Sequence, residues 1–319
     1  MRPLLPADAR LLTTPEPACL LDGLTVALTS SEAGRLTVLA PQLTGRLTLQ
    51  QAAAAPDDAA LISRLHDAGV VFDLPVIDGA VPVGPFCDYL YARISGWRCR
   101  KHPDQWPWRE VITTGQARTQ YLQGIVLENY HYVRAAAIRQ SPLLSHAAPA
   151  AVFDLVRDFV MGEAAHETYF WDTLTRWGLA EHDIEQAVPL TSTAQFIALQ
   201  YRLAHLSVLD YLAGSAVIEV DPDAYARQGD PYAPWETAYG IAPEILAPVR
   251  QHIRDDVTSG HAQLFRAVAL ASAPSALPLA VATSALLSAW TVFEATRLWQ
   301  RDMYEHYHVN GRTPGRAGL

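Results

Sequence analysis

The residues of this 319-residue chain that could do chemistry are carboxylates and histidines gathered in four segments that read as helices. Their oxygen and imidazole-nitrogen groups belong, in chain order, to Glu128, His131, Glu163, His166, Glu219, His252, Asp256 and His261. Two iron ions need about this inventory, drawn inward from several helices. If the set converges, the sequence predicts an oxygen-activating metalloenzyme.

The spacing within each segment decides which groups can act together. Glu163 and His166 are three residues apart, and His252 and Asp256 are four apart, so each pair is predicted to share one helix face. Glu219 ends the apolar run LAGSAVIE, where a buried charge is costly unless it is paired. Carboxylates and imidazoles without thiolates favour iron or manganese over structural zinc. Taken singly, each group also has an ordinary interpretation as a surface pair, a helix cap or a solvated face.

Helical periodicity predicts the element arrangement that must position these groups. Residues 116–319 are expected to form a mainly α-helical body, with helices over 116–140, 148–178, 182–188, 190–215, 243–271 and 279–300, and a further one at 301–308. The stretch 267–290 is nearly uncharged, but it is weakly apolar and interrupted by Pro274 and Pro278. It is therefore predicted to be a loop followed by a buried bundle helix, not a membrane span.

A small α+β domain is predicted over residues 1–80, and its part at 15–77 has a winged-helix-like order. The order is a hairpin at Asp22-Gly23, a helix with a serine N-cap, a helix in RLTLQQAAAA, a helix capped by Asp57 or Asp58, and a strand. Residues 81–115 are predicted to be a linker. Its basic run RCRKH, with Trp97, Trp106 and Trp108, is expected to pack on the bundle.

The composition limits which binding partners and which cellular compartment are expected. The net charge is −9 and the isoelectric point about 5.6, which favours neither nucleic acid nor an anionic membrane as a partner. The N-terminal segment has no signal-peptide pattern, and the three cysteines have no CxxC spacing. A cytoplasmic protein is expected.

Four segments, taken in order, resemble the core helices of the heme-oxygenase-like diiron oxidases, relatives of the TenA thiaminases and the pyrroloquinoline quinone synthase. The segments are QGIVLENYHYVRAAAIRQSPLL, GEAAHETYFWDTLTRWGL, LSVLDYLAGSAVIE and QHIRDDVTSGHAQL, within residues ~116–305. The resemblance implies a heme-oxygenase-like helical bundle. By position it implies that the iron ligands are Glu163, His166, Glu219, His252 and Asp256.

Two positions depart from the family pattern. The family's last histidine follows the aspartate by three residues, where this chain has Ser259, whereas His261 follows Asp256 by five. An undistorted helix would turn His261 away, so a π-bulge, made cheaper by Gly260, is expected to bring it back. Glu128 stands where many relatives have glutamine, and it is included either as an extra iron ligand or as a hydrogen-bond partner of one.

A ferritin-like arrangement is an alternative for the ligands. It would use the two ExxH motifs, Glu128/His131 and Glu163/His166, and would leave His252 and Asp256 without a role.

The implied function is that of a non-heme diiron oxidase or oxygenase, which uses two Fe ions and dioxygen on an amino-acid- or peptide-derived substrate. Residues 15–77 resemble the PqqD-like leader-peptide domains in LLDG, APQLTGRLTLQQ and ALISRLHDAGVV. This implies a peptide or carrier-bound substrate, as in the biosynthesis of ribosomal peptide natural products. The fold also implies a possible homodimer. The alternatives are a metal-free cofactor-binding enzyme of the TenA type and a peptide-binding adaptor.

Overall fold

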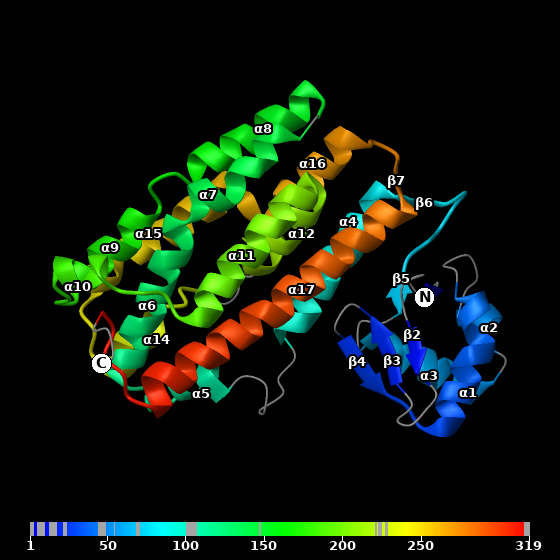
Figure 1. The fold of residues 1–319 in the computed structure, drawn as a ribbon, viewed down its shortest axis with the longest axis horizontal. Coiled ribbons are helices and arrows are strands. Elements are labelled where there is room, and N and C mark those ends of the chain that lie inside the picture. The colour runs from blue at the N-terminus through cyan, green and yellow to red at the C-terminus, as the bar shows by residue number, and fades with distance from the viewer. Residues whose placement is uncertain are drawn as a thin grey trace.

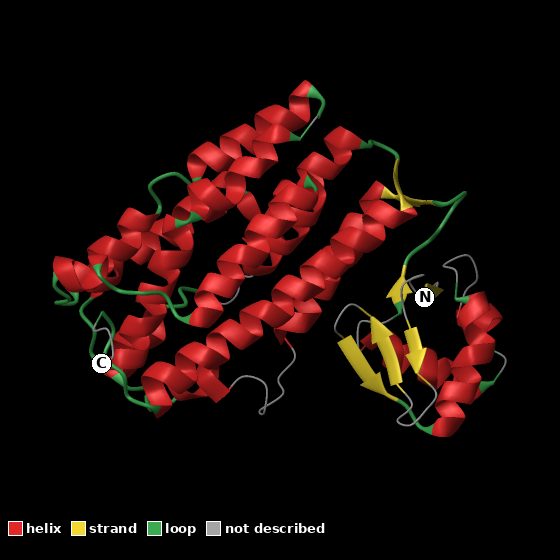
Figure 2. Cartoon of the chain, in the orientation of Figure 1, coloured by secondary structure: helices red, strands yellow, loops and turns green. Residues whose placement is uncertain are grey.

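Helices dominate the computed structural model, as the sequence predicts (Figures 1 and 2). The structure describes residues 3–4, 10–12, 18–21, 24–43, 49–53, 55–67, 71–99, 107–146, 148–220, 222, 225–226 and 229–315. Two clusters of buried side chains make up the core in this part of the chain. The smaller is built from residues of the 28–71 range, and the larger from residues of the 72–307 range.

The front unit contains an antiparallel sheet of order β2-β3-β4 and three helices. Its elements are β1 (Pro3–Leu4), β2 (Arg10–Leu12), β3 (Ala18–Leu21), β4 (Leu24–Ala27), α1 (Ser30–Leu39), α2 (Leu49–Ala52), α3 (Pro56–Asp67) and β5 (Phe72–Asp73). β3 pairs with β4 from Leu21↔Leu24 outward, which confirms the hairpin. β1 pairs with β5 and joins the two ends of the unit.

Two helix starts in this unit differ from the sequence prediction. Thr29, not a serine, caps α1, and Glu32 completes a capping box with it. α3 begins at Pro56, and Asp58 accepts a hydrogen bond from the Ala55 N–H at 3.0 Å, so Asp58 lies inside the first turn and is not the cap residue. Caps shift by a residue or two because several neighbouring polar side chains can serve.

The predicted linker at 81–115 is largely helical. β6 (Ala80–Pro82) pairs with β7 (Ala276–Pro278), and α4 (Val83–Cys99) then packs against α16 and α17. Phe86, Leu90 and Ile94 are fully or almost fully buried there, because an apolar stripe at helical spacing meets an apolar face of the body. Trp97 packs on the bundle as expected, with its ring 5.0 Å from that of Trp290. Residues 100–106, and the side chain of Trp108, lie outside the described residues.

The helical body continues from α5 (Pro107–Thr113). Its helices are α6 (Thr119–Arg134), α7 (Ala136–Gln140), α8 (Ala150–Gly162), α9 (Glu167–Arg176), α10 (Glu181–Glu185), α11 (Thr191–Leu206), α12 (Val208–Ile218), α14 (Ala233–Tyr239), α15 (Pro243–Ser259), α16 (Leu264–Ser272) and α17 (Leu279–Met303). A π-helical turn, Tyr304–Val309, extends α17. α12 packs closely on α17, where a Cβ on Gly214 would lie 2.7 Å from Val292 Cγ2.

Four of the predicted long helices are each broken in two. The breaks fall at Ala135, between Gly162 and Glu167, at Ser207, and between Ser259 and Leu264. Ser207 is extended and its hydroxyl caps α12 by accepting from the Asp210 N–H. Periodicity did not reveal these breaks, because the apolar pattern continues across them. Two of the four lie at the candidate site.

One stretch, Leu279–Val309, is long and apolar enough to cross a membrane by length and composition. A bundle helix passes the same test, and α17 packs against α4, α11 and α12 with Ala285, Ala289 and Val292 fully buried. α17 thus packs in the bundle as predicted, with 39% of its most apolar stretch buried, whereas the predicted loop before it is partly helical because α16 extends to Ser272. Figure 1 shows α17 running the length of the body beside α4.

Candidate metal centre

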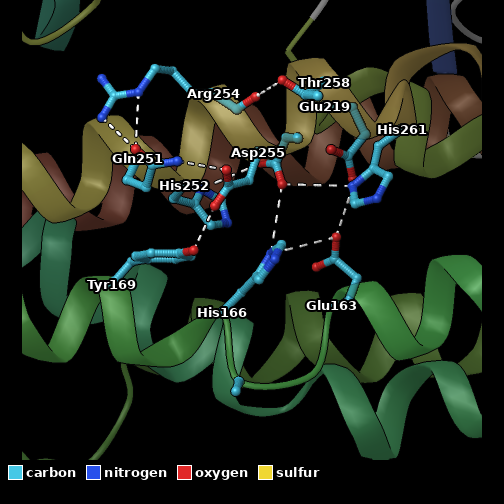
Figure 3. A network of polar contacts seen from close by, with 12 residues as sticks. Glu163, His166, Tyr169, Glu219, Gln251, His252, Arg254, Asp255, Thr258 and His261 are labelled. Atoms are coloured by element: carbon cyan, nitrogen blue, oxygen red, sulfur yellow. Dashed lines mark hydrogen bonds and ion pairs between the residues drawn. The ribbon is translucent and has the colours of Figure 1, made fainter.

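Four segments from three distant parts of the sequence bring six of the seven predicted ligands together. The connection between α8 and α9 supplies Glu163 and His166, the end of α12 supplies Glu219, α15 supplies His252 and Asp256, and the turn after α15 supplies His261. Figure 3 shows Glu163 and His166 pointing from the α8–α9 connection toward His252, Glu219 and His261. The predicted convergence is therefore present in the structure.

Asp256 lies at the centre of this cluster. Its Oδ2 is 3.3 Å from His252 Nδ1, and its Oδ1 is 3.6 Å from both His166 Nδ1 and His261 Nδ1. His261 Nδ1 is also 2.9 Å from Glu163 Oε1. Two groups with metal-ligand spacing result, His166–His252–Asp256 and Glu163–Asp256–His261, and Asp256 belongs to both. A carboxylate shared by two groups is the arrangement that can bridge two cations.

The backbone around Glu163 and His166 is not the single helix predicted. α8 ends at Gly162, Glu163 caps it, and α9 starts after His166. Ala165 between them has φ of +69°, a region that residues with a Cβ rarely occupy. His166 Nδ1 still lies 3.9 Å from Glu163 Oε1. The pair thus acts across a helix break rather than along one helix face.

His261 reaches the cluster by a helix end, not by the expected π-bulge. α15 stops at Ser259, Gly260 takes a left-handed φ of +69°, and a 3-10 turn, His261–Gln263, follows. Gly260 is the residue that allows this reversal at little cost, because it has no Cβ. His261 is buried and its ring packs edge-on against Phe159, 5.1 Å away.

Crowding of three carboxylates perturbs their ionisation. Burial, then the charges of Glu219 and Glu163, raise the pKa of Asp256 to about 9. Burial, then Glu163, raise the pKa of Glu219 to about 7, although this side chain is partly accessible because it borders a cavity. Burial also acts to raise the pKa of Glu163, but His261, Arg139 and His166 outweigh it and the pKa falls. These acids cannot all ionise together without added positive charge.

The histidines complete the electrostatic setting. Burial, then His166, lower the pKa of His252 to about 4, which leaves a neutral ring able to donate a lone pair. Burial would lower the pKa of His261, but its contact with Glu163 and the charge of Glu219 raise it overall.

The donor set fits metal ions. His166 Nδ1, His261 Nδ1 and Asp256 Oδ1 are buried polar atoms without a well-formed hydrogen bond among the described residues. His261 Nδ1 lies 2.9 Å from Glu163 Oε1, which is an ion-pair distance. The carboxylate oxygen lies away from the ring N–H direction, so the two groups do not form a well-formed hydrogen bond. Buried orphan donors and acceptors are costly, and a cation bound between them would satisfy all three atoms.

Glu128, also predicted as a site residue, does not join the cluster. It is fully buried, and it accepts hydrogen bonds from the Leu190 N–H at 3.1 Å, from the Thr193 hydroxyl and from the Tyr307 hydroxyl at 2.6 Å. None of these donors is a predicted ligand, so Glu128 ties α6 to the start of α11 and to the C-terminal turn. This is a correction, and its cause is that Glu128 has a complete set of protein donors.

The structure does not support the ferritin-like alternative, which requires Glu128 and His131 as ligands. Neither Glu128 nor His131 takes part in a group with metal-ligand spacing among the described residues. His131 is buried, and burial, then Arg134, lower its pKa to about 4.

Residues outside the predicted ligand set support the cluster. Arg98 donates to the Val217 and Glu219 carbonyls at 2.9 and 2.8 Å, which holds the end of α12 where Glu219 projects. Tyr169 donates to Asp255 at 2.5 Å, and its ring lies 5.8 Å from that of His252. Arg98 lay in the noticed basic run, but no local signal tied it to α12, 119 residues away.

A cavity of about 120 Å³ adjoins the cluster. Glu163, Glu219, His252 and Asp256 border it on one side. Tyr132 and Phe170 also border it, whereas Tyr130 and Trp171 pack against each other with their ring centroids 5.8 Å apart. Arg139, which sequence reasoning did not single out, also borders the cavity and is 3% exposed. The sequence signal that could have identified Arg139 is its spacing of seven residues from Tyr132, which is about two turns of a helix.

Comparison with known proteins identifies the fold. The sequence matches no protein-family model and no curated protein. Its structure is similar to a solved domain of unknown function with a heme oxygenase-like fold from Shewanella denitrificans OS217. That similarity has a TM-score of 0.59 at 16% sequence identity, and covers 76% of this chain and 100% of that chain. The protein therefore has a heme oxygenase-like fold, with a buried carboxylate and histidine cluster that could bind metal.

Proposed function

We propose that this protein is a non-heme diiron oxidase or oxygenase, with the cluster around Asp256 as its metal centre. The observation that carries the proposal is the sharing of Asp256 by two ligand groups, one buried and the other, with His166 and His252, partly buried. Iron bound there would supply the redox chemistry with dioxygen that side chains alone do not have.

The residues of the chain have distinct parts in this proposal. His252 and His166 supply ring nitrogens to one of the two groups that share Asp256, and Glu163 and His261 belong to the other. Glu219 borders both the cluster and the cavity, so its carboxylate is placed to exchange between a metal and a proton. The low exposure of Glu163, Asp256 and His261 keeps bulk water from the centre.

A metal-free function of the TenA type is less well supported. Such a protein would place small or apolar side chains where this chain places three carboxylates and three histidines. Burying that set without a cation is costly, because three of its polar atoms have no well-formed hydrogen bond among the described residues.

The direct test is an anaerobic Fe(II) titration of metal-free protein, with Mn(II) in parallel, followed by mixing with O2 in a stopped-flow spectrometer. We expect two equivalents of Fe(II) per chain and a transient visible absorption after O2. Because Asp256 is shared, Asp256→Asn should weaken both binding events, whereas His252→Ala and His261→Ala should each weaken chiefly one. His182→Ala, at an exposed histidine of α10, is the matched control.

Two outcomes would overturn the proposal. One is wild-type Fe(II) stoichiometry and affinity in Asp256→Asn. The other is the absence of stoichiometric iron or manganese in the wild type.

We further propose that the front unit receives a peptide, so that the substrate is an amino-acid residue of a peptide or a carrier-bound group. Among the described residues β4 pairs only with β3, so its outer edge can add a strand if Arg64 releases the Ala27 carbonyl, to which it donates at 3.3 Å. Hydrogen exchange on the full chain should show protection of residues 24–27 when a ribosomal precursor peptide binds. Binding without protection there would contradict this mode.

A further inference from the structure

The cavity beside the metal centre contains a buried cation without an ionic partner. Arg139 is 3% exposed, one of its terminal nitrogens donates to the Tyr211 hydroxyl, and its guanidinium lies 4.1 Å from the centre of the Tyr132 ring. Its Nε has no hydrogen-bond partner, and no carboxylate of the described residues forms an ion pair with it. A buried charge left in this state is unusual, because desolvation is costly without a counterion.

Arg139 remains charged in this setting. Burial acts to lower its pKa, but Tyr132, Tyr211, Glu163 and Glu219 outweigh burial and raise the pKa above its ordinary value. In the metal-free protein the negative field of Glu163 and Glu219 partly offsets the guanidinium charge.

Metal binding would remove that offset. Glu163, Glu219 and Asp256 carry at most three negative charges, whereas two divalent cations bring four positive charges and Arg139 one more. The loaded centre and its cavity would then carry about two net positive charges in a water-poor space. An anionic ligand in the cavity would reduce that excess. This step rests on the diiron function proposed above.

The other walls of the cavity are suited to a short carbon chain. Phe170, Ile218 and Trp299 give apolar surface, and the Asn129 amide is oriented by its hydrogen bond to the Ile125 carbonyl at 2.8 Å. A volume of about 120 Å³ limits the occupant to a small group such as a short-chain acid. A planar guanidinium pairs best with a planar, two-oxygen anion.

We propose that this cavity is the substrate site and that Arg139 binds a substrate carboxylate there, which for the peptide substrate proposed above is that of an acidic side chain or of the C-terminal residue. The terminal nitrogen of Arg139 that does not donate to Tyr211 would hold the carboxylate, and the carbon chain would lie along Trp299 and Phe170 toward Glu219 and Asp256. Arg139 is then the residue that selects acids over neutral analogues and sets which carbon faces the centre.

Binding of matched probes tests this proposal without turnover. Butyrate, butyramide and butylamine have the same chain length and different head groups. Ligand-observed NMR or calorimetry on Zn(II)-loaded full-length protein should show butyrate binding roughly 10- to 100-fold more tightly than butyramide, as charge-assisted hydrogen bonds imply. Equal affinity for the acid and the amide would overturn the proposal, and this comparison needs no variant.

Variants then assign the contact to Arg139. Arg139→Gln should lose most of the preference for butyrate, and Arg139→Lys should retain part of it, while both still bind two metal ions. Arg134→Gln, which removes an exposed arginine near Tyr130, is the matched control and should behave as wild type. If Arg139→Gln keeps the full preference, the carboxylate is held by the metal instead, and the assignment fails.

The outcomes separate this inference from the function it rests on. Two bound metals with no selection for the acid would refute the anion site and leave the metal centre intact. A wild type that binds butyrate through Arg139 but takes up no stoichiometric metal would refute the diiron function instead. Preferential binding of phosphate over butyrate would contradict the carboxylate assignment.

Discussion

Replacement of Asp256 by asparagine should stabilise the metal-free protein, although it removes the central ligand. The pKa of Asp256 is raised from 3.8 to about 9, by burial first and then by Glu219 and Glu163. At pH 7 the folded protein holds a proton there that the unfolded chain has released, so this group opposes folding. The ordinary pKa of 3.8 lies about three pH units below pH 7, and each unit corresponds to about 1.4 kcal/mol. The free-energy cost of Asp256 to folding at pH 7 is therefore at most roughly 4 kcal/mol. Asparagine is neutral and nearly isosteric, so it removes this cost.

The sign of the pH dependence makes the prediction specific. Because the folded state binds the extra proton between pH 4 and 9, wild-type stability falls as pH rises through that range. The advantage of Asp256→Asn should therefore be about 1 to 2 kcal/mol at pH 5 and grow toward pH 9. Urea unfolding in EDTA at pH 5, 7 and 9 measures it. With metal present, the order of stability should reverse, because the variant no longer binds the ions that stabilise the wild type.

The neighbouring acid is the matched control. Hydrogen bonding by Tyr169 lowers the pKa of Asp255, despite opposition from burial. Asp255 thus stabilises the fold above its ordinary pKa and loses that effect as pH falls, so Asp255→Asn should destabilise at pH 7. A metal-free Asp256→Asn protein that is less stable than wild type at pH 7, or whose difference does not grow with pH, would refute the reasoning.

Further predictions concern metal affinity, the residues that hold the site in place, and backbone strain. Metal affinity should rise about tenfold per pH unit for each proton displaced from Asp256 or Glu219, with a slope between about one and two from pH 6 to 8 that calorimetry can measure, because both pKa values are raised by burial. Arg98→Met should lower metal affinity about 10- to 100-fold by freeing the α12 end, as seen by competition with a chelator, with far-ultraviolet circular dichroism unchanged. Glu128→Gln should cost about 1–3 kcal/mol in urea unfolding yet bind metal as wild type, since its three donors lie outside the cluster. Ala165→Gly should raise the melting temperature of the metal-free protein or leave it unchanged, because glycine accepts φ of +69° without strain, and a clear decrease would contradict that account.

The predicted ligands show how much of the site can be identified from residue types and their order in the sequence. Six of the seven come together, and Glu219 was identified although it stands alone at the end of an apolar helix. The pattern was readable because carboxylates and histidines are rarely placed on buried helix faces without a partner. Glu128 had the same local appearance, but its partners come from α11 and from Tyr307, 179 residues away, and no local pattern contains that pairing.

The backbone breaks mark the limit of periodicity. Glu163 and His166, and then Asp256 and His261, lie on either side of helix ends that the sequence presented as continuous helices. Gly260 hinted at one break. Ala165 gave no hint of the other, because alanine is a strong helix former held in a left-handed conformation by its surroundings.

The sequence by itself determined the mainly helical class, the small α+β front and the chemical type of the site, since these follow from local periodicity and from donor atoms. Tertiary structure alone decided that Asp256 is shared by two groups, that α4 belongs to the body and that Arg139 forms no ion pair with a carboxylate in the part of the chain that the structure describes. Each of these three features depends on contacts between residues that are far apart in the sequence. Arg98 and Glu219, for example, are more than a hundred positions apart and are in hydrogen-bond contact. Packing, not local preference, sets such distances.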